Sequence, residues 1–496
     1  MGAGKTSAAR AAAAALGARA VDSDHVLEER LGSTVEEYFA SHGERAFRAA
    51  EEDVVAELLE RPPSPVLSLG GGAIASERVR PLLEGHTVVL LDVDEDTAWR
   101  RAGGRRPLAR DRSRFAAMLE ERRPLYDSLA DAVLTDSSRD VVRRAVPALR
   151  ALAGAPPGTR LLWATADSGE YPVYVGEGLV GSGFRALAGD AHVVTDETVG
   201  ALYGDAVEAV SRVAIPPGET AKTLPTAGRV LEALAEAGLD HDGHVIALGG
   251  GVVGDLAGFC AAVYQRGVRV VQMPTTLVAQ VDSAYGGKTG VDLPQGKNYA
   301  GVYHQPAAVL ADPRTLATLP REELAAGWAE VIKTALIAGG PLWKRVRSRA
   351  AEADRDLVLA CARTKLAVVA ADERDAGARQ SLNLGHTVAH AIETITGYAR
   401  YRHGEAVGLG LLAALTLSAQ PALREEVADL LAERGLPTRL DPAIDPAAVV
   451  AATARDKKRR GGRVGFALVE APGDVRTGMA VSPDDLRAAV AELERS

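Results

Sequence analysis

Short apolar runs that alternate with amphipathic segments indicate strands and helices in the first part of the chain. The runs at 66–72 and 86–94 are typical of buried strands, and an alanine-rich stretch at 11–18 is typical of a helix. Larger strand signals follow at 191–197, 244–251 and 268–276. Strands that alternate with helices predict parallel sheets with helical connections.

The pattern changes twice along the chain. Small residues, two prolines and a glycine at 153–160 separate two periodic regions, and from about residue 322 long alanine- and leucine-rich helical patterns replace the strands. We therefore predict a small parallel-sheet domain at 1–152, a linker at 153–160, a doubly wound α/β domain at 161–321 and a mainly α-helical domain at 322–496.

Composition narrows the class of protein. With 496 residues, 47% hydrophobic and 25% charged, the chain is long enough for several domains with their own cores. A net charge of −9 gives no indication of nucleic-acid binding, which would favour a basic domain. Cys260 and Cys361 lie far apart and suggest no disulfide framework, and no segment reads as a signal peptide or a membrane span. We expect a cytoplasmic protein that binds neither nucleic acid nor membrane.

The opening residues MGAGKT contain the last part of a phosphate-binding loop. Backbone amides around Gly2 and Gly4 at a helix N-terminus can cradle phosphates, Lys5 would reach the β- and γ-phosphates of ATP, and Thr6 would ligate Mg²⁺. By itself the motif is equally compatible with a capped helix start.

Other polar groups in the first domain favour the nucleotide interpretation. Asp22 and Asp24 lie in AVDSDH, Arg48 lies in ERAFRAAE, and three glycines at 70–72 follow a strand. Arginine clusters at 103–108 and 121–127 could bind carboxylate or phosphate bidentately.

That set, in that order, resembles shikimate kinase through nearly all of residues 1–150. The resemblance implies a P-loop kinase-like fold and an activity that phosphorylates shikimate with ATP. It implies that Lys5 and Thr6 bind ATP and Mg²⁺, with Asp22 in the outer shell of the metal, and that Asp24 binds shikimate and removes its proton. It further implies that Arg48 and Arg122 bind the shikimate carboxylate, that Gly70, Gly71 and Gly72 line the pocket, and that Arg106 neutralises the phosphoryl group.

The resemblance is incomplete at its front. Members of that family begin with an apolar strand and the full glycine loop, and neither is present in this sequence. Burial of such a strand contributes about 10 kcal/mol, which is comparable to the stability of a whole domain. We therefore expect a destabilised kinase domain, explained either by a start site assigned too late or by a truncation that leaves an inactive relic.

A second glycine-rich turn lies in HVIALGGGVVGDLAGF, where Gly249, Gly250 and Gly251 separate an apolar run from a helix. Such a turn lets a pyrophosphate approach the backbone in Rossmann-like domains, although tight turns use glycine for other reasons. Polar residues at other strand ends could hold ribose and phosphates: Asp196, Thr198, Glu219, Lys222, Thr275 and Thr276.

The stretch 280–301 combines Asp282, Lys288, Lys297 and Asn298 with many glycines and no apparent apolar face. We interpret it as a long irregular segment, which in compact domains is usually functional, rather than as a plain solvent loop. Two lysines there suit an anionic, phosphorylated substrate.

Candidate metal ligands lie in the helical domain. Glu330 and Lys333 are three residues apart, and His386 and His390 are four apart, so each pair shares a helix face. With His403, one carboxylate and two histidines would leave open positions on Zn²⁺ for substrate, as in catalytic sites. Single histidines usually have structural roles, but these three fall in two glycine-flanked motifs.

These stretches together resemble 3-dehydroquinate synthase over about 160–490. The resemblance implies Zn²⁺ (or Co²⁺) binding by Glu330, His386 and His403 and NAD binding by Asp196, Glu219, Lys222, Gly250, Gly251, Asp255, Thr275 and Thr276. It implies a substrate site formed by Asp282, Lys288, Lys297, Asn298, Lys333, Lys365, Arg379, Asn383, His390 and Lys458, with Arg266 from a neighbouring subunit and hence a homodimer.

The implied activity is conversion of 3-deoxy-D-arabino-heptulosonate 7-phosphate to 3-dehydroquinate plus phosphate, with NAD reduced and reoxidised in each cycle. Both activities belong to aromatic amino acid biosynthesis, so a bifunctional shikimate-pathway enzyme is expected. The alternatives are a synthase with an inactive kinase relic and a metal- and NAD-dependent polyol dehydrogenase, which would not need the lysine set.

Overall fold

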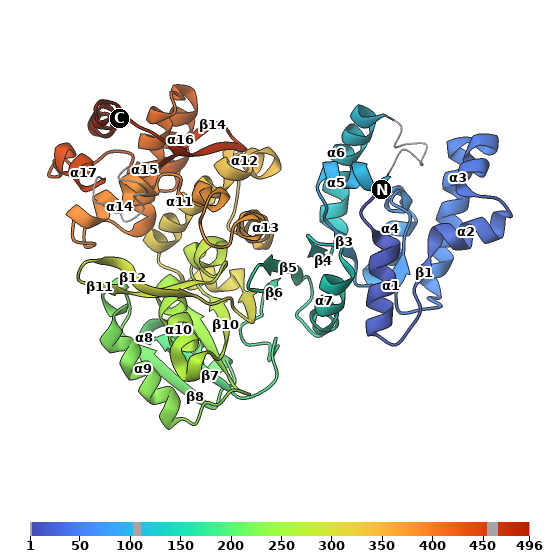
Figure 1. Ribbon diagram of the computed structural model, residues 1–496, viewed down its shortest axis with the longest axis horizontal. Helices are drawn as coiled ribbons and strands as arrows, with labels where there is room; N and C mark the ends of the chain where they lie inside the picture. Colours follow the sequence, from blue (N-terminus) through green and yellow to red (C-terminus); the bar gives the residue numbers. More distant parts are fainter. Residues whose placement is uncertain (1, 103–110, 454–464, 496) are drawn as a thin grey trace. The chain divides into compact units, whose positions relative to one another are not determined.

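The computed structural model describes residues 2–102, 111–453 and 465–495. The chain forms two compact units, Met1–Ala164 and Thr165–Ser496 (Figure 1). Unit 1 and unit 2 below denote these two ranges.

Unit 1 is built on short parallel strands with helices around them. The helices are α1 (Lys5–Ala15), α2 (Ser23–Leu31), α3 (Val35–Glu60), α4 (Val79–Leu82), α5 (Glu95–Ala102), α6 (Arg112–Leu129) and α7 (Arg139–Leu152). One sheet pairs β1 (Val21–Asp22) with β2 (Leu67–Ser68), and a second runs β3 (Val89–Leu91), β4 (Ala132–Leu134) and β5 (Arg160–Ala166). The predicted parallel α/β fold of this part is confirmed.

The strands of unit 1 form separate sheets. Among the described residues β2 pairs with β1 alone, and β3 pairs with β4 alone. Val89 of the edge strand β3 is 37% exposed, which is high for valine in a strand. The core of this unit is therefore carried largely by helices, with α3 packing Val55 and Leu59 against Val79 of α4.

Unit 2 begins with a parallel sheet in the order β6 (Gly169–Val175), β13 (Ala308–Ala311), β10 (Arg269–Pro274), β9 (His244–Gly249), β7 (Ala191–Asp196) and β8 (Ser211–Ile215). The helices α8 (Glu197–Tyr203), α9 (Leu224–Glu236) and α10 (Gly251–Val263) connect or cover these strands (Figure 1). Continuous burial of β9 matches its uninterrupted apolar sequence, as expected for a strand covered on both faces. The predicted doubly wound fold is confirmed.

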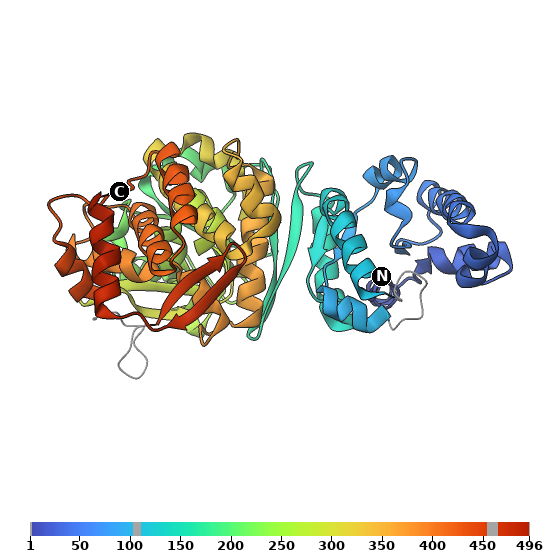
Figure 2. The same cartoon turned by 90° about the horizontal axis from the view of Figure 1, so that it is seen from above.

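The rest of unit 2 is mainly helical, as predicted. It contains α11 (Arg321–Ala338), α12 (Gly340–Arg347), α13 (Arg355–Ala371), α14 (His386–Ile395), α15 (His403–Leu417), α16 (Pro421–Glu433), α17 (Pro446–Thr453) and α18 (Pro483–Arg495). A hairpin of β14 (Phe466–Ala471) and β15 (Asp474–Met479) lies along the outside of these helices (Figure 2). In α15 nearly every residue is buried, so this apolar helix is at the centre of the helical part.

The interpretation of 280–301 as an irregular segment is wrong. The structure has a π-helical turn, η7 (Ala279–Ser283), followed by an antiparallel hairpin of β11 (Lys288–Leu293) and β12 (Gly296–Tyr303). This hairpin lies between the sheet and the helical part (Figure 1). Val291 is fully buried, and the cross-strand neighbours Gly290 and Gly301 allow close backbone approach, which a periodicity count does not detect.

None of the helices in the described ranges is both long enough and apolar enough to span a membrane.

Candidate active sites

The helices that carry the predicted metal ligands pack at backbone distance. A Cβ on Gly404 would lie 1.9 Å from the carbonyl oxygen of Ala326, so only glycine lets α15 approach α11 this closely. Gly385, with φ 77°, starts α14 in a left-handed conformation. These glycines bring the first residues of α14 and α15 to the middle of α11.

Glu330, His386 and His403 form a compact cluster. Their ligand atoms lie within 4.8 Å of one another, and Oε1 of Glu330 is 3.5 Å from Nε2 of His386 and 3.4 Å from Nε2 of His403. Nδ1 of His386 lies 3.1 Å from the carbonyl of Leu384, so its N–H donates there and leaves Nε2 as the acceptor.

The cluster fits a divalent cation. Glu330 is 1% exposed, and its Oε1, which faces both imidazoles, has no hydrogen-bond partner of good geometry among the described residues. A buried carboxylate oxygen rarely lacks a partner unless a cation binds to it. Two imidazole nitrogens and one carboxylate oxygen are a donor set suited to Zn²⁺ or Co²⁺ with open positions.

Lysines surround this carboxylate and Asp282. Lys333 places Nζ 2.5 Å from Oε2 of Glu330 and 3.5 Å from Asp282, and Lys365 lies 3.0 Å from Asp282. Burial opposes ionisation of Glu330, but Lys333 and His386 outweigh it and hold the pKa of Glu330 well below its usual range. Burial likewise opposes ionisation of Asp282, yet the two lysines lower its pKa to about 2.

For Lys365 the effect of burial is larger than the effect of its charged neighbours. Its burial lowers its pKa to about 8, and the attraction of Asp282 only partly offsets this. A lysine whose charge is held so weakly gains from an anionic ligand, because the anion replaces the solvation that burial removed.

Glu393 was missed by the sequence analysis. It is 2% exposed, and its Oε1 lies 3.3 Å from Nδ1 of His403 and 3.1 Å from Nζ of Lys297. Its position on α14, three residues after His390 and seven after His386, could have identified it, because this spacing keeps all three on one helix face.

The remaining predicted substrate residues have the following positions and contacts. Arg379 is buried and donates to the carbonyls of Glu373 and Gly286, and Lys288 pairs with Asp375 at 2.6 Å. The ring of His390 is centred 5.5 Å from that of His386. The others are Asn298, exposed on β12, and Asn383, at the end of η9 (Ala378–Asn383).

A second ionic cluster lies on the nucleotide side. Nζ of Lys222 is 2.8 Å from Glu219, 3.2 Å from Asp255 and 3.9 Å from Asp292, and Lys297 lies 3.4 Å from Glu219. Burial opposes the charge of Lys222, but Asp255 and Glu219 raise its pKa above the ordinary lysine value. Asp292 was not predicted from the sequence.

The glycine turn at the start of α10 fits a dinucleotide. Cβ atoms on Gly250 and Gly251 would lie 2.8 Å from Cγ2 of Thr276 and 3.0 Å from Oγ of Ser283, so the turn has no room for side chains. Gly250 begins α10 without a side-chain cap, and Oγ1 of the buried Thr275 has no hydrogen-bond partner among the described residues. Open amides and an unsatisfied hydroxyl suit a phosphate or ribose. Gly249, the last residue of β9, leads into this turn.

The positions described for three further predicted residues lie outside these two clusters. Asp196 caps α8 by accepting from the N–H of Val199, and Thr198 is exposed on that helix. Arg266 is exposed after the C-terminal end of α10, with φ 69°. Since α10 has 13 residues, Arg266 stands about 20 Å along the helix from the glycine turn.

In unit 1 the predicted phosphate-loop residues come together. Gly4, with φ 82°, begins α1 without a side-chain cap, and Lys5 is the first residue of this helix. Oγ1 of Thr6 donates to Asp22 at 2.6 Å, which unites the two predicted Mg²⁺ residues. Gly2 lies against Ala98, whose carbonyl would collide with any side chain there.

The predicted shikimate residues lie around the glycines at 70–72. A Cβ on Gly72 would lie 2.1 Å from Nη1 of Arg48, and one on Gly70 would lie 3.0 Å from Oδ1 of Asp24. Arg122 donates to the carbonyl of Gly71 at 3.4 Å. The sequence analysis missed Glu51, whose buried carboxylate lies 2.5 Å from Arg48 and whose pKa is raised by burial. Arg106 and Lys458 lie outside the described residues.

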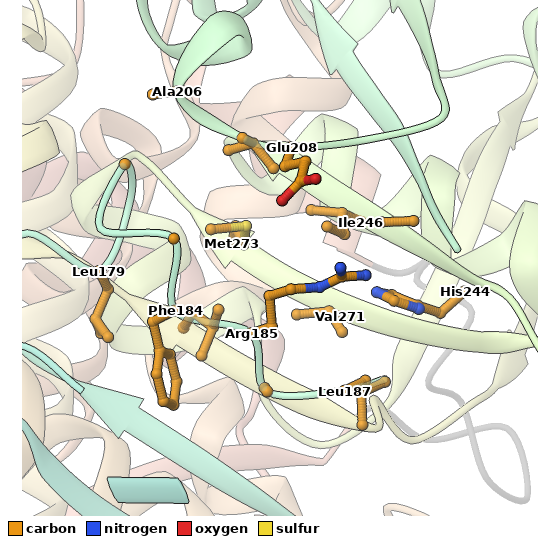
Figure 3. A pocket seen from close by; sticks show the side chains of 16 residues that line it. Leu179, Phe184, Arg185, Leu187, Ala206, Glu208, His244, Ile246, Val271 and Met273 are labelled. Carbon is orange, nitrogen blue, oxygen red and sulfur yellow. The ribbon is translucent and has the colours of Figure 1, made fainter. Parts of the chain in front are cut away.

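A separate cavity of about 50 Å³ lies near the amino ends of strands β7 and β9 (Figure 3). Arg185, Glu208 and His244 are grouped around an apolar floor that includes Ile246 and Val271. None of its lining residues in the described structure belongs to the predicted sites, and the predicted NAD residues Gly250 and Thr275 follow the opposite, carboxyl ends of β9 and β10.

Comparison with known proteins agrees with the division of the chain into unit 1 and unit 2. The family model of shikimate kinase matches residues 1–150, and those of the N-terminal and C-terminal parts of 3-dehydroquinate synthase match 212–326 and 327–459. The 3-dehydroquinate synthase of Halorhodospira halophila is 46% identical over 334 residues, 64% of this chain and 94% of that protein. That of Symbiobacterium thermophilum is 43% identical over 353 residues, 66% of this chain and 98% of that protein.

Solved structures give the same fold for unit 2. The 2-epi-5-epi-valiolone synthase of Streptomyces hygroscopicus, solved with NAD⁺ and Zn²⁺ bound, is 27% identical with a TM-score of 0.61 and covers 66% of this chain and 98% of its own. A 2-deoxy-scyllo-inosose synthase at 24% identity and TM-score 0.60, over 67% of this chain and 99% of its own, shares the fold.

The chain belongs to the 3-dehydroquinate synthase family. It carries a shikimate kinase part at its N-terminal side, so the prediction of two fused shikimate-pathway enzymes is confirmed. The relatives named are synthases, which disfavours a polyol dehydrogenase.

Proposed function

We propose that unit 2 converts 3-deoxy-D-arabino-heptulosonate 7-phosphate to 3-dehydroquinate plus phosphate, using NAD and Zn²⁺ or Co²⁺. The observation that carries this proposal is the cluster of Glu330, His386 and His403, which is surrounded by lysines and linked through η7 to the glycine turn of α10. A bound metal would polarise a substrate hydroxyl, and bound NAD would accept and return a hydride. NAD⁺ and Zn²⁺ in the related valiolone synthase support this assignment.

The basic residues of this site would orient the substrate. Lys333 and Lys365 are held in place by Asp282, so their ammonium groups are already positioned before an anion arrives. Lys288 and Lys297 on the β11–β12 hairpin approach from the side of the sheet. Preorganised cations of this kind stabilise developing negative charge without reorganisation during the reaction.

Unit 1 would transfer the γ-phosphoryl group of ATP to shikimate. Asp24 lies close to the glycines that border Arg48, so the hydroxyl and carboxylate ends of one small substrate can be held together. Thr6 and Asp22 would bind Mg²⁺ with ATP at the start of α1.

A cytoplasmic homodimer formed through the synthase parts is part of this proposal. Arg266 is exposed at the end of α10 away from the glycine turn, which suits a role in the site of a neighbouring subunit. A reducing compartment suits the two buried free cysteines, Cys260 and Cys361.

The test measures phosphate release and NADH together. Wild-type protein with heptulosonate phosphate, NAD and Zn²⁺ should release phosphate without accumulating NADH. Glu330→Gln should lose at least about 100-fold in kcat, because the carboxylate ligand is removed. Glu322→Gln, exposed on the same helix, is the control and should keep full activity. Steady accumulation of NADH with a polyol would contradict the proposed synthase.

A further inference from the structure

Glu393 touches groups of both cofactor sites. Its Oε1 is 3.3 Å from Nδ1 of His403, whose Nε2 faces Glu330, and 3.1 Å from Nζ of Lys297. Lys297 lies on the β11–β12 hairpin, whereas the other two residues lie on helices of the C-terminal part.

The ion pairs continue from Lys297 to the nucleotide side. Lys297 is 3.4 Å from Glu219, Glu219 is 2.8 Å from Lys222, and Lys222 is 3.2 Å from Asp255. An unbroken chain of alternating charges therefore runs from Glu393, which lies beside a predicted metal ligand, to the predicted NAD residues. Glu393 is the residue that connects His403 on the metal side with Lys297 on the nucleotide side.

We propose that Glu393 is a positioning residue that fixes the His403 ligand and the Lys297 ammonium at the same time, and so couples the metal site to the NAD site. The proposal rests on the proposed function, since it presupposes that both cofactors bind there.

The physical reason lies in the two nitrogens of His403. A carboxylate that accepts from the N–H of Nδ1 fixes the tautomer and the ring orientation, and makes Nε2 a better ligand. In the structure both ring nitrogens of His403 face carboxylates, Nδ1 at 3.3 Å from Glu393 and Nε2 at 3.4 Å from Glu330, so the ring is held from two sides.

Lys297 depends on the same carboxylate. Glu393 is almost fully buried, so its charge is poorly screened and holds the ammonium in one position. Without that charge Lys297 keeps Glu219 as its other acidic contact, and Glu219 is then drawn away from Lys222. The Glu219–Lys222 pair on the nucleotide side should loosen as a result.

The experiment measures affinities for Zn²⁺ and NAD separately in the full chain. Zn²⁺ binding is followed by competition with a chromogenic chelator, and NAD binding by calorimetry on metal-free protein. Glu393→Gln keeps the size of the side chain and removes its charge. We expect Zn²⁺ affinity to fall about 10- to 100-fold and NAD affinity to fall about threefold, the effect of one partly exposed ion pair.

Glu373→Gln is the matched control. Glu373 is also 2% exposed and accepts from Ser168 and Gln305, but it touches neither a predicted metal ligand nor a lysine of the chain described above. It should leave both affinities unchanged. An equal loss in this variant would overturn the proposal, because the effect would then be a general one of buried charge.

Unchanged Zn²⁺ affinity in Glu393→Gln, or weaker Zn²⁺ binding with unchanged NAD binding, would also overturn the coupling. Should Glu393→Gln not fold, Glu393→Asp decides, since it keeps the charge but withdraws the carboxylate, and an unchanged Zn²⁺ affinity there would overturn the proposal. Failure of the wild type to bind Zn²⁺ would instead contradict the proposed function itself.

Discussion

At the scale of single residues, the positions of cations decide what each site can bind. Arg48 lies against Gly72 in unit 1, and Lys365 lies against Asp282 in unit 2. The position of Arg48 depends on the absence of a side chain at Gly72, and the position of Lys365 depends on the carboxylate of Asp282. Each dependence gives a prediction.

Gly72→Ala should weaken shikimate binding. The added methyl group would lie 2.1 Å from Nη1 of Arg48, so the guanidinium must move away from the glycines at 70–72. We expect KM for shikimate to rise about tenfold, the value of roughly one charged hydrogen bond, with kcat changed less. Gly85→Ala is the control, because nothing lies within 4 Å of its Cβ position. Equal KM values in both variants would contradict the assignment of Arg48.

Lys365 should give the synthase a descending limb at high pH. Its pKa is lowered to about 8, so its ammonium is charged below this pH and neutral above it. Since kcat/KM reports the free enzyme, kcat/KM should fall as pH rises through about 8. Steady-state rates between pH 6.5 and 9.5 measure this, and Lys365→Gln should lack the limb. A level wild-type profile up to pH 9.5 would argue against a charged Lys365 in binding.

At the scale of elements, the two units differ in how their sheets are built. In unit 2 a continuous parallel sheet is covered by helices, whereas in unit 1 the strands β1 and β2 form a separate pair of two residues each. Such short strand pairs are marginal by themselves, and Val89 on β3, at 37% exposed, buries less area than a core valine.

We therefore expect unit 1 to unfold at a lower temperature than unit 2. Calorimetry of the full chain should show two transitions, because the chain divides into two compact units. Saturating shikimate should raise only the lower midpoint and Zn²⁺ only the upper one, since a ligand stabilises the unit that binds it. A single transition shifted by both ligands would show that the units unfold together.

At the scale of the whole molecule, the two activities should be separable. Their predicted residues fall entirely within unit 1 or entirely within unit 2. Asp24→Asn should abolish shikimate-dependent ADP formation and leave dehydroquinate synthesis within about twofold of wild type, whereas Glu330→Gln should do the reverse. Coupled assays on the same preparations measure both rates. Loss of ADP formation in Glu330→Gln would show that the kinase depends on the synthase site.

The sequence by itself determined much of this protein. Apolar periodicity predicted the strands at 191–197, 244–251 and 268–276 and the helical part from about 322, because burial leaves its period in local sequence. Residue type and spacing indicated a carboxylate and histidines as candidate ligands in the helical part, and the resemblance to 3-dehydroquinate synthase assigned Glu330, His386 and His403, which lie together in the structure.

Only the tertiary structure decided which charges meet. Glu393 and Lys297 are 96 residues apart, and Lys365 and Asp282 are 83 residues apart. The hairpin at 288–303 likewise depends on pairing between strands and on burial between the sheet and the helices. Ion pairs such as these join residues distant in sequence, and the burial of the hairpin depends on other elements, so local patterns contain no record of either.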